Sequence, residues 1–333
     1  MNGALSIIVY ENKNMTLCLS VFFLFSLCLI LAAQHPLAGL QKDSLKELES
    51  KKIRDFNFVA AGDFGCSGKA NKTITVMKST NPEIVLALGD LSYQKYPDCW
   101  FNAISPLDNG GKFKIMFGEH DIDDDLVKYN QYLKHFNLTK PFYSFDYQNV
   151  HFLVMATSKN QVVSYLTDSE QYKFVKQDLS KAHGNKSIDW IIVSSFRPLY
   201  SSNTTHPGLD KLQDTYHKLF EKYDVDLVLQ AHNHNYQRTY PLLYNEVRQS
   251  IPIITDNSTW SYGSDVKGQI FLTVGTGGQE LYNFIGQGPY VVTQFLLHGF
   301  LNVEVTDNGS KLSGTFYDNR KLKDRDHFTI QRK

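Results

Sequence analysis

Five short apolar runs, each ending at polar residues, constrain most strongly how this chain can fold. They are FNFVAA (56–61) before GDFG, IVLAL (84–88) before GDLSY, FKIMF (113–117) before GEHD, WIIV (190–193) before SSFRPLYSS, and VDLVL (225–229) before QAHNH. Short runs rich in β-branched residues are typical of strands that are buried on both faces. The pattern therefore predicts a buried sheet whose strands end in chemically active side chains.

Helical patterns lie between several of these runs. Apolar residues repeat at helical spacing over 126–136 and over 212–223. Thr167 and Glu170 fit a capping box that opens a helix through about residue 182. Strands that alternate with helices predict an α/β fold, in which ligands gather at the carboxyl ends of the strands.

The C-terminal part of the chain has a different pattern. GQIFLTVGTGG (268–278) predicts one more strand followed by a glycine-rich loop. FLNVEVTDNGSKLSGTFYD (300–318) predicts a hairpin that turns at Asn308 and Gly309, a favoured pair in tight turns. The GTGG sequence lacks the spacing of nucleotide-binding loops, so we interpret it as a loop beside the functional site.

Polar residues at the strand ends form a candidate metal site. They are Asp63, Asp90, Tyr93, Glu119, His120, His232 and His234. We expect His232 and His234 to lie on the same side of an extended chain, because strand side chains alternate. An isolated aspartate after a strand is often a helix cap, and an isolated tyrosine is often a packing aromatic. Together, carboxylates, a phenol and imidazoles without a thiolate suit iron, zinc or manganese.

The order of these residues, D-x-G, G-D-x-x-Y, G-x-H-D and H-x-H, resembles that of the calcineurin-like metallophosphoesterases. The tyrosine in GDLSY, with RPLY and HNHNYQR, narrows the resemblance to the purple acid phosphatases over residues 56–320. The resemblance implies an α/β fold in which two mixed β-sheets form a sandwich flanked by α-helices. It also implies a dinuclear metal site that hydrolyses phosphate monoesters with a metal-activated water.

The resemblance also assigns metal ligands by position. It implies that Asp63, Tyr93 and His234 hold the first metal, which is iron in this family. Asp90 would bridge both metals. His232 would hold the second, a divalent zinc, manganese or iron ion.

Two further histidines have expected roles in catalysis. The resemblance implies that His120 binds the substrate phosphate. His206 matches the histidine thought to protonate the leaving alkoxide. The alternative for His206 is an ordinary solvated loop histidine. With the bridging Asp90, these are the candidate catalytic residues.

Two residues depart from the family pattern. Glu119 stands where the pattern has asparagine, and Phe196 stands where it has a histidine ligand. Phenylalanine cannot bind a metal. Glu119 can supply both missing donors, but its negative charge weakens the attraction for phosphate and makes a bound water less acidic. We therefore expect a slower phosphomonoesterase, with a catalytically impaired metal- or phosphate-binding relative at the cell surface as the alternative. Diester and nucleotide substrates stay open.

The N-terminal segment predicts export. Residues 16–34 carry no charge and are mostly apolar, which predicts a signal peptide or an N-terminal membrane anchor within residues 1–34. Residues 35–55 read as a linker, and residues 56–333 as the catalytic domain. Six N-x-[ST] sequons follow the apolar segment, at Asn71, Asn137, Asn185, Asn203, Asn257 and Asn308. We therefore expect a glycoprotein that is secreted or anchored at the extracellular face of the membrane.

Charge and cysteine content limit the possible partners. Lys+Arg and Asp+Glu balance at 34 each, so no overall field attracts nucleic acid, and only the N-terminal segment is expected to contact a membrane. The expected partner is a phosphate ester. Only Cys66 and Cys99 lie beyond the apolar segment, where they can pair in an oxidising compartment or stay free.

Overall fold

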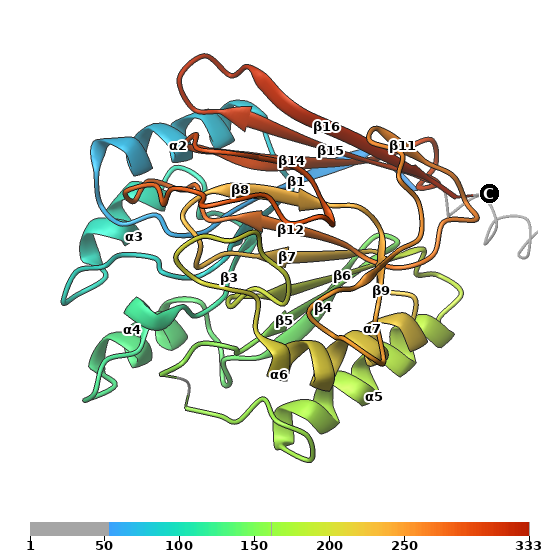
Figure 1. Cartoon of the computed structure of the whole chain (residues 1–333). Helices are drawn as coiled ribbons and strands as arrows, with labels where there is room; N and C mark the ends of the chain where they lie inside the picture. Colours follow the sequence, from blue (N-terminus) through green and yellow to red (C-terminus); the bar gives the residue numbers. More distant parts are fainter. Residues whose placement is uncertain (1–52, 161, 333) are drawn as a thin grey trace, which may run out of the picture. The chain divides into compact units, whose positions relative to one another are not determined.

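Two seven-stranded mixed sheets pack against each other in the computed structural model (Figure 1). The structure describes residues 53–160 and 162–332. The predicted signal peptide or anchor and most of the predicted linker lie outside the described residues. Within the described part, no helix combines the length and the apolar character that a membrane crossing requires.

The first sheet has the order β11-β16-β15-β14-β1-β2-β3. Its three N-terminal strands are parallel to one another, and β14 joins them antiparallel to β1. The strands are β1 (Phe56–Ala61), β2 (Ile84–Ala87), β3 (Phe113–Ile115), β11 (Ser261–Tyr262), β14 (Gly299–Thr306), β15 (Lys311–Asp318) and β16 (Asp324–Gln331).

The second sheet has the order β13-β8-β12-β7-β6-β5-β4, and its central strands from β12 to β5 are parallel. Its strands are β4 (Tyr143–Tyr147), β5 (Val150–Met155), β6 (Trp190–Ser195), β7 (Leu227–Gln230), β8 (Tyr236–Thr239), β12 (Ile270–Val274) and β13 (Val291–Phe295). A small separate ribbon pairs β9 (Leu242–Leu243) with β10 (Ile253–Ile254).

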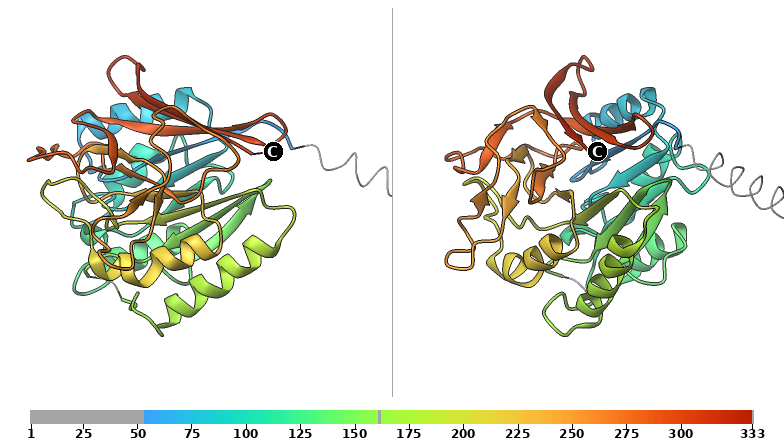
Figure 2. Two further views of the ribbon diagram at one scale, coloured as in Figure 1. Left: turned by 45° about the vertical axis from the view of Figure 1, so that its right-hand side comes forward. Right: turned by 90° about the vertical axis from the view of Figure 1, so that its right-hand side faces the viewer.

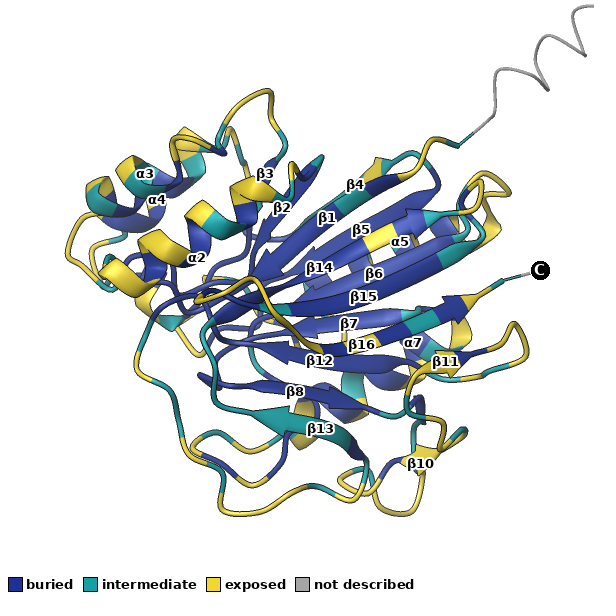
Figure 3. Cartoon of the chain, turned by 90° about the horizontal axis from the view of Figure 1, so that it is seen from above, coloured by how far each residue is buried: buried dark blue, intermediate teal, exposed yellow. Residues whose placement is uncertain are grey.

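Helices flank the sandwich (Figure 2). They are α2 (Gly68–Ser79), α3 (Asp98–Ile104), the 3₁₀ turn η1 (Glu119–Asp121), α4 (Val127–His135), α5 (Glu170–Gly184), α6 (Asp210–Leu212), the π-helical turn η2 (Gln213–His217) and α7 (Lys218–Lys222). Buried apolar residues of α5 and α7 pack on the outer face of the second sheet, while the main core lies between the two sheets. Figure 3 shows the central strands, such as β1, β6, β7 and β12, almost fully buried, whereas β10 and β13 are more exposed and the helices have one exposed side.

The predicted α/β sandwich of two mixed sheets is confirmed. All five apolar runs form strands, and the predicted hairpin turns at Asn308 and Gly309, which both have left-handed backbone angles. The predicted capping box is wrong. The helix begins at Glu170, and Ser169 rather than Thr167 is its N-cap, because the Ser169 hydroxyl accepts from the Tyr172 N–H at 3.1 Å. Sequence analysis did not anticipate β5 or β16.

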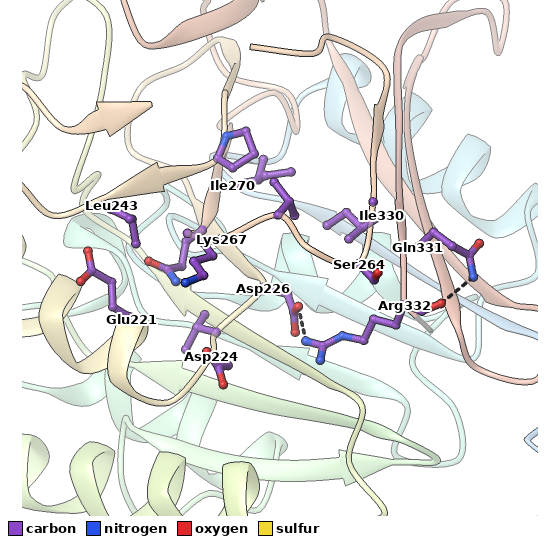
Figure 4. A pocket seen from close by; sticks show the side chains of 16 residues that line it. Glu221, Asp224, Asp226, Leu243, Ser264, Lys267, Ile270, Ile330, Gln331 and Arg332 are labelled. Atoms are coloured by element: carbon purple, nitrogen blue, oxygen red, sulfur yellow. Dashed lines mark hydrogen bonds and ion pairs between the residues drawn. The ribbon is translucent and has the colours of Figure 1, made fainter. Parts of the chain in front are cut away.

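The last residues of the chain are tied to the second sheet. Arg332 forms an ion pair with Asp226 at 2.5 Å (Figure 4). Its guanidinium lies 4.7 Å from the Trp190 ring centroid. Asp226 also accepts from the Ile191 N–H, and burial raises the pKa of Asp226 to about 6. The pocket in Figure 4 therefore lies at the amino end of β7. The candidate ligands His232 and His234 follow the carboxyl end of this strand.

Candidate metal centre

Four of the predicted metal ligands meet at one point. Asp63, Asp90 and His234 offer ligand atoms that all lie within 4.8 Å of one another, and each side chain is buried. The Tyr93 hydroxyl lies 3.2 Å from Asp63 Oδ1, 3.0 Å from Asp90 Oδ2 and 3.0 Å from His234 Nε2. The loops after β1, β2 and β7 thus bring two carboxylates, a phenol and an imidazole together.

Strained backbone positions carry most of these side chains. Asp63, Asp90, Tyr93 and His232 all have positive φ angles, between 49° and 68°. Such angles are unfavourable for residues other than glycine and concentrate at functional sites. The expectation of an extended chain at the H-x-H pair is wrong. His232 and His234 follow the end of β7 in a series of bends, and the left-handed angle at His232 turns the chain back toward Asp63.

Backbone hydrogen bonds fix the orientation of the candidate ligands. Asp63 Oδ2 accepts from the His232 N–H at 3.0 Å, and Asp90 Oδ1 accepts from the His120 N–H at 2.8 Å. His234 Nδ1 donates to the Glu280 carbonyl at 2.7 Å. This bond leaves the lone pair of His234 on Nε2, which faces the carboxylates, as a metal-binding histidine requires.

Two charged residues hold the supporting loops together. Asp121 accepts from the Leu91 and Gly118 N–H groups, each at 2.8 Å, and so joins the loops after β2 and β3. Lys128 donates to the carbonyls of Gln94 and His120, at 2.7 Å and 2.5 Å. These contacts place the loop that carries His120 against the loop that carries Tyr93.

The glycine-rich loop after β12 lies beside the site, as predicted. A Cβ atom at Gly275 would lie 2.6 Å from Asp63 Oδ2, and Gln279 donates its N–H to the Asp63 carbonyl at 3.0 Å. Only glycine allows the loop to approach this closely. Tyr282, farther along the same loop, stacks on His234 with ring centroids 3.9 Å apart.

The electrostatics of this cluster suit a bound cation. Burial raises the pKa of Asp90 well above its ordinary value, and the neighbouring Asp63 raises it further. Burial and the same two carboxylates also raise the pKa of Tyr93. A positive ion among these oxygen atoms would stabilise their charged forms. The donors Asp63, Asp90, Tyr93 and His234 therefore fit the first metal of the expected centre.

The residues expected around the second metal do not form a comparable set. His232 Nε2 lies 3.9 Å from Glu119 Oε1, but no third histidine, cysteine or acidic residue in the described part of the chain joins this pair to form a group that could hold an ion. Phe196 is fully buried, and its ring centroid lies 4.9 Å from that of His232. In the described part of the chain, Asp63, Asp90 and His234 form the one group of three or more histidine, cysteine or acidic residues close enough to share an ion. Phe196 thus supplies no donor where the family pattern has one.

The two expected catalytic histidines both lie at the site. The His206 ring stacks on the His232 ring with centroids 3.7 Å apart, and the His120 ring lies 4.2 Å from that of Tyr93. Burial, followed by the neighbouring His206 and Arg197, lowers the pKa of His232 to about 2. His232 is therefore neutral, as a metal ligand must be.

Sequence analysis did not single out Arg197 or Tyr282. Arg197 lies directly after Phe196, and its Nε atom lies 3.9 Å from Glu119 Oε1. Its place in the SSFRPLYSS segment, next to the residue that replaces the expected histidine, is the one sequence signal for Arg197. Tyr282 carries no sequence signal beyond its nearness to the glycine-rich loop.

The chain is similar to phosphoesterases over most of its length. The family model "Calcineurin-like phosphoesterase" matches residues 56–236. Purple acid phosphatase 21 of Arabidopsis thaliana is 27% identical over 243 residues, which cover 67% of this chain and 50% of that protein. Probable inactive purple acid phosphatase 27 of the same plant is 28% identical over 278 residues, which cover 74% and 43%. The chain thus spans about half the length of the curated relatives it matches.

Solved structures show the same fold. A purple acid phosphatase PPD1 from yellow lupin (Lupinus luteus) seeds has a TM-score of 0.70 at 21% identity, over 85% of this chain and 55% of that one. GAP50, described as the anchor in the inner membrane complex of Plasmodium, has a TM-score of 0.61 at 18% identity, over 84% and 90%. With the family match over more than half of its residues, the chain belongs to the calcineurin-like phosphoesterase family.

Proposed function

We propose that this protein is an exported, metal-dependent phosphomonoesterase. The observation that carries the proposal is the meeting of Asp63, Asp90, Tyr93 and His234 at the strand ends of a phosphoesterase fold. The similarity to purple acid phosphatases supports phosphate monoesters as the substrate class.

The metal at the first site is iron in this proposal. The fold family implies a dinuclear centre, and the phenol of Tyr93 favours ferric iron because a tyrosinate is a hard, negatively charged ligand. A second ion, a divalent zinc, manganese or iron as the family pattern implies, would have only Asp90, His232 and Glu119 as donors. The metal supplies a nucleophilic water and positive charge for the phosphate when it is bound.

The chain's own residues orient the ester and supply a proton. His120 lies beside Tyr93 and His206 beside His232, where each can donate a hydrogen bond to a phosphate oxygen. When the phosphorus–oxygen bond to the alcohol breaks, the electron pair goes to the leaving oxygen, and protonated His206 gives that oxygen its proton.

A spectroscopic experiment tests this function. The purified protein should hydrolyse p-nitrophenyl phosphate, contain at least one metal ion per chain and show a visible tyrosinate-to-iron band. Tyr93→Phe should abolish the band, whereas Tyr96→Phe, at an exposed tyrosine three residues away, should leave it unchanged. Less than one metal ion per chain in a folded protein would contradict the proposal.

Export has its own support and its own test. All six sequon asparagines, which lie on separate surface segments, are exposed. We expect the protein purified from its native source to lose mass on enzymatic or chemical removal of N-linked glycans. An unmodified mass, with the apolar N-terminal segment still attached to a protein in the cell interior, would contradict export.

An impaired relative that only binds metal or phosphate is the second candidate. Phe196 and Glu119 favour it, because they replace a histidine and an asparagine of the family pattern. Full metal content and phosphate binding without turnover would identify this alternative.

A further inference from the structure

A positive side chain lies beside the residues expected around the second metal. The Arg197 Nε atom and the His232 Nε2 atom each lie 3.9 Å from the same oxygen, Glu119 Oε1. Arg197 and His232 therefore both lie next to the same carboxylate oxygen, with Glu119 common to the two contacts. An imidazole, one carboxylate and a guanidinium are a poor set for a divalent ion, because the guanidinium repels it.

Phe196 packs tightly beside His232, where the family pattern has a histidine ligand. Its side chain is fully buried, and a Cβ atom at Gly89 would lie 2.7 Å from Phe196 Cδ2. The ring is thus packed tightly against the turn that precedes Asp90. It cannot move aside to admit a ligand from elsewhere in the core without opening a cavity.

The backbone of Arg197 is held on both sides. Its N–H donates to Thr157 Oγ1 at 3.2 Å, and its carbonyl accepts from the Ser195 hydroxyl at 3.0 Å. The Thr157 and Ser195 hydroxyls also bond each other at 3.1 Å, inside the protein. The starting point of the arginine side chain is therefore fixed by buried polar contacts.

The guanidinium itself has unused donors. Its one ion pair within residues 53–160 and 162–332 is the 3.9 Å contact with Glu119, and its N–H groups make no hydrogen bond in that part of the chain. The Arg197 side chain keeps 26% of its surface exposed, so a solute can reach it. An arginine presents several N–H groups in a planar fork that matches two phosphate oxygens.

We propose that Arg197 binds the phosphate group of the substrate in place of a second metal ion, so that this protein works with one metal ion per chain. The proposal rests on the proposed phosphatase function and names the residue that replaces half of the usual centre. Glu119 neutralises Arg197 in the free protein and keeps the guanidinium over the site. The guanidinium N–H groups that do not bond Glu119 then donate to two phosphate oxygens.

Metal content and phosphate affinity test this proposal on the full-length protein loaded with iron. The probe is inorganic phosphate, measured by calorimetry. We expect one metal ion per chain in the wild type. Arg197→Met should keep that metal content and weaken phosphate binding by about 10- to 100-fold, the contribution of a charge-assisted bidentate contact. Arg197→Lys, which keeps the charge but loses the fork, should lie between the two.

A matched control removes an exposed arginine elsewhere. Arg248 lies between β9 and β10, and Arg248→Met should bind phosphate as the wild type does. Thermal melting of each variant shows that it is folded. Two metal ions per wild-type chain, or unchanged phosphate affinity in Arg197→Met, would overturn the proposal.

Hydrolysis of p-nitrophenyl phosphate by the wild type separates this proposal from the proposed function. If the wild type turns over the substrate and Arg197→Met binds phosphate as tightly as the wild type, the role of Arg197 is wrong and the phosphatase function stands. If the wild type does not turn over the substrate but binds phosphate, and Arg197→Met loses that binding, the proposed hydrolase function is wrong and Arg197 is still a phosphate ligand.

Discussion

The imidazole ring of His206 lies nearly parallel to that of His232, with an interplanar angle of 18° and centroids 3.7 Å apart. The two rings come from the loops after β6 and β7. Asn233 joins these loops, because its side-chain amide accepts from the His206 N–H at 3.0 Å and donates to the His206 carbonyl at 2.7 Å. The H-x-H segment therefore positions His206 as well as supplying candidate metal ligands.

Replacing His206 should slow the hydrolysis of alkyl phosphates far more than that of p-nitrophenyl phosphate. An alkoxide needs a proton as it leaves, whereas p-nitrophenolate is stable without one. For His206→Asn we expect kcat on an alkyl phosphate to fall about 100- to 10,000-fold, the usual worth of a general acid. His183→Asn, at a partly exposed histidine of α5, is the control. Equal losses on both substrates would show that His206 is not the proton donor.

Restoring the family residues at positions 196 and 119 should create a second metal site. The double variant Phe196→His with Glu119→Asn supplies two neutral donors beside His232 and removes one negative charge. We expect metal content to rise from one toward two ions per chain, with the single variants closer to the wild type. A large gain of phosphatase activity from a silent parent would favour the impaired-relative alternative. If the double variant binds the same number of metal ions per chain as the wild type, the expectation is wrong.

The sequence predicted the strands near the site better than the site's backbone. Apolar runs such as 56–61 and 84–88 form strands because their burial is set by local composition. The turn at His232 could not be predicted in this way. Its left-handed angle is stabilised by the bond from its N–H to Asp63, which lies 169 residues away in the chain. Such an angle is unfavourable locally and persists only because long-range contacts compensate for it.

Arg197 shows the same limit at the level of side chains. The sequence places it next to Phe196, but its nearness to Glu119 depends on β6 and η1 meeting at one end of the sandwich. A lone arginine has no periodicity and no motif of its own. The missing histidine was visible from the sequence, whereas the cation beside that position required the fold.

Reduction of the disulfide should destabilise the region around the first metal. Cys66 and Cys99 are bonded, with Cα atoms 5.9 Å apart and a sequence separation of 33. The bond joins the loop after Asp63 to α3. Closing a loop of this length stabilises a protein by about 3–4 kcal/mol. We expect reductant to lower the Tm by roughly 10 °C for a domain of this size.

The double variant Cys66→Ser with Cys99→Ser is the control for this measurement. Its Tm should match that of the reduced wild type and should not respond to reductant. Two free thiols in the unreduced, folded wild type would contradict the bond and remove one argument for an oxidising compartment.

A second cluster, formed by His151, Asp146 and Asp178, should make the stability of the fold depend on pH. His151 Nδ1 lies 2.6 Å from Asp146 Oδ1, and His151 Nε2 lies 2.8 Å from Asp178 Oδ2. Ser144 donates to the other oxygen of Asp178 at 2.7 Å. The cluster ties β4, β5 and α5 together. Since both ring nitrogens face carboxylates, the imidazole must carry two protons to satisfy them.

The pKa of His151 gives the direction of the effect. Burial alone would lower this pKa, but the hydrogen bonds to Asp178 and Asp146 outweigh burial and raise it above the ordinary value. A folded-state pKa above the unfolded value of about 6.5 means that the stabilisation is complete below that pH. It is lost as pH rises through the higher folded-state pKa.

Replacing His151 should therefore cost most at acidic pH. Glutamine does not titrate and cannot donate to both carboxylates. We expect His151→Gln to lower the free energy of unfolding by about 1–3 kcal/mol at pH 5.5 and by less at pH 9. Each kcal/mol corresponds to a loss of about 2–4 °C in Tm. His135→Gln, at a histidine paired with the single carboxylate of Asp108, controls for a more exposed pair. Because only the gap between variant and wild type is compared, other titrating groups cancel. A gap that stays constant from pH 5.5 to pH 9 would show that His151 is not held as an imidazolium.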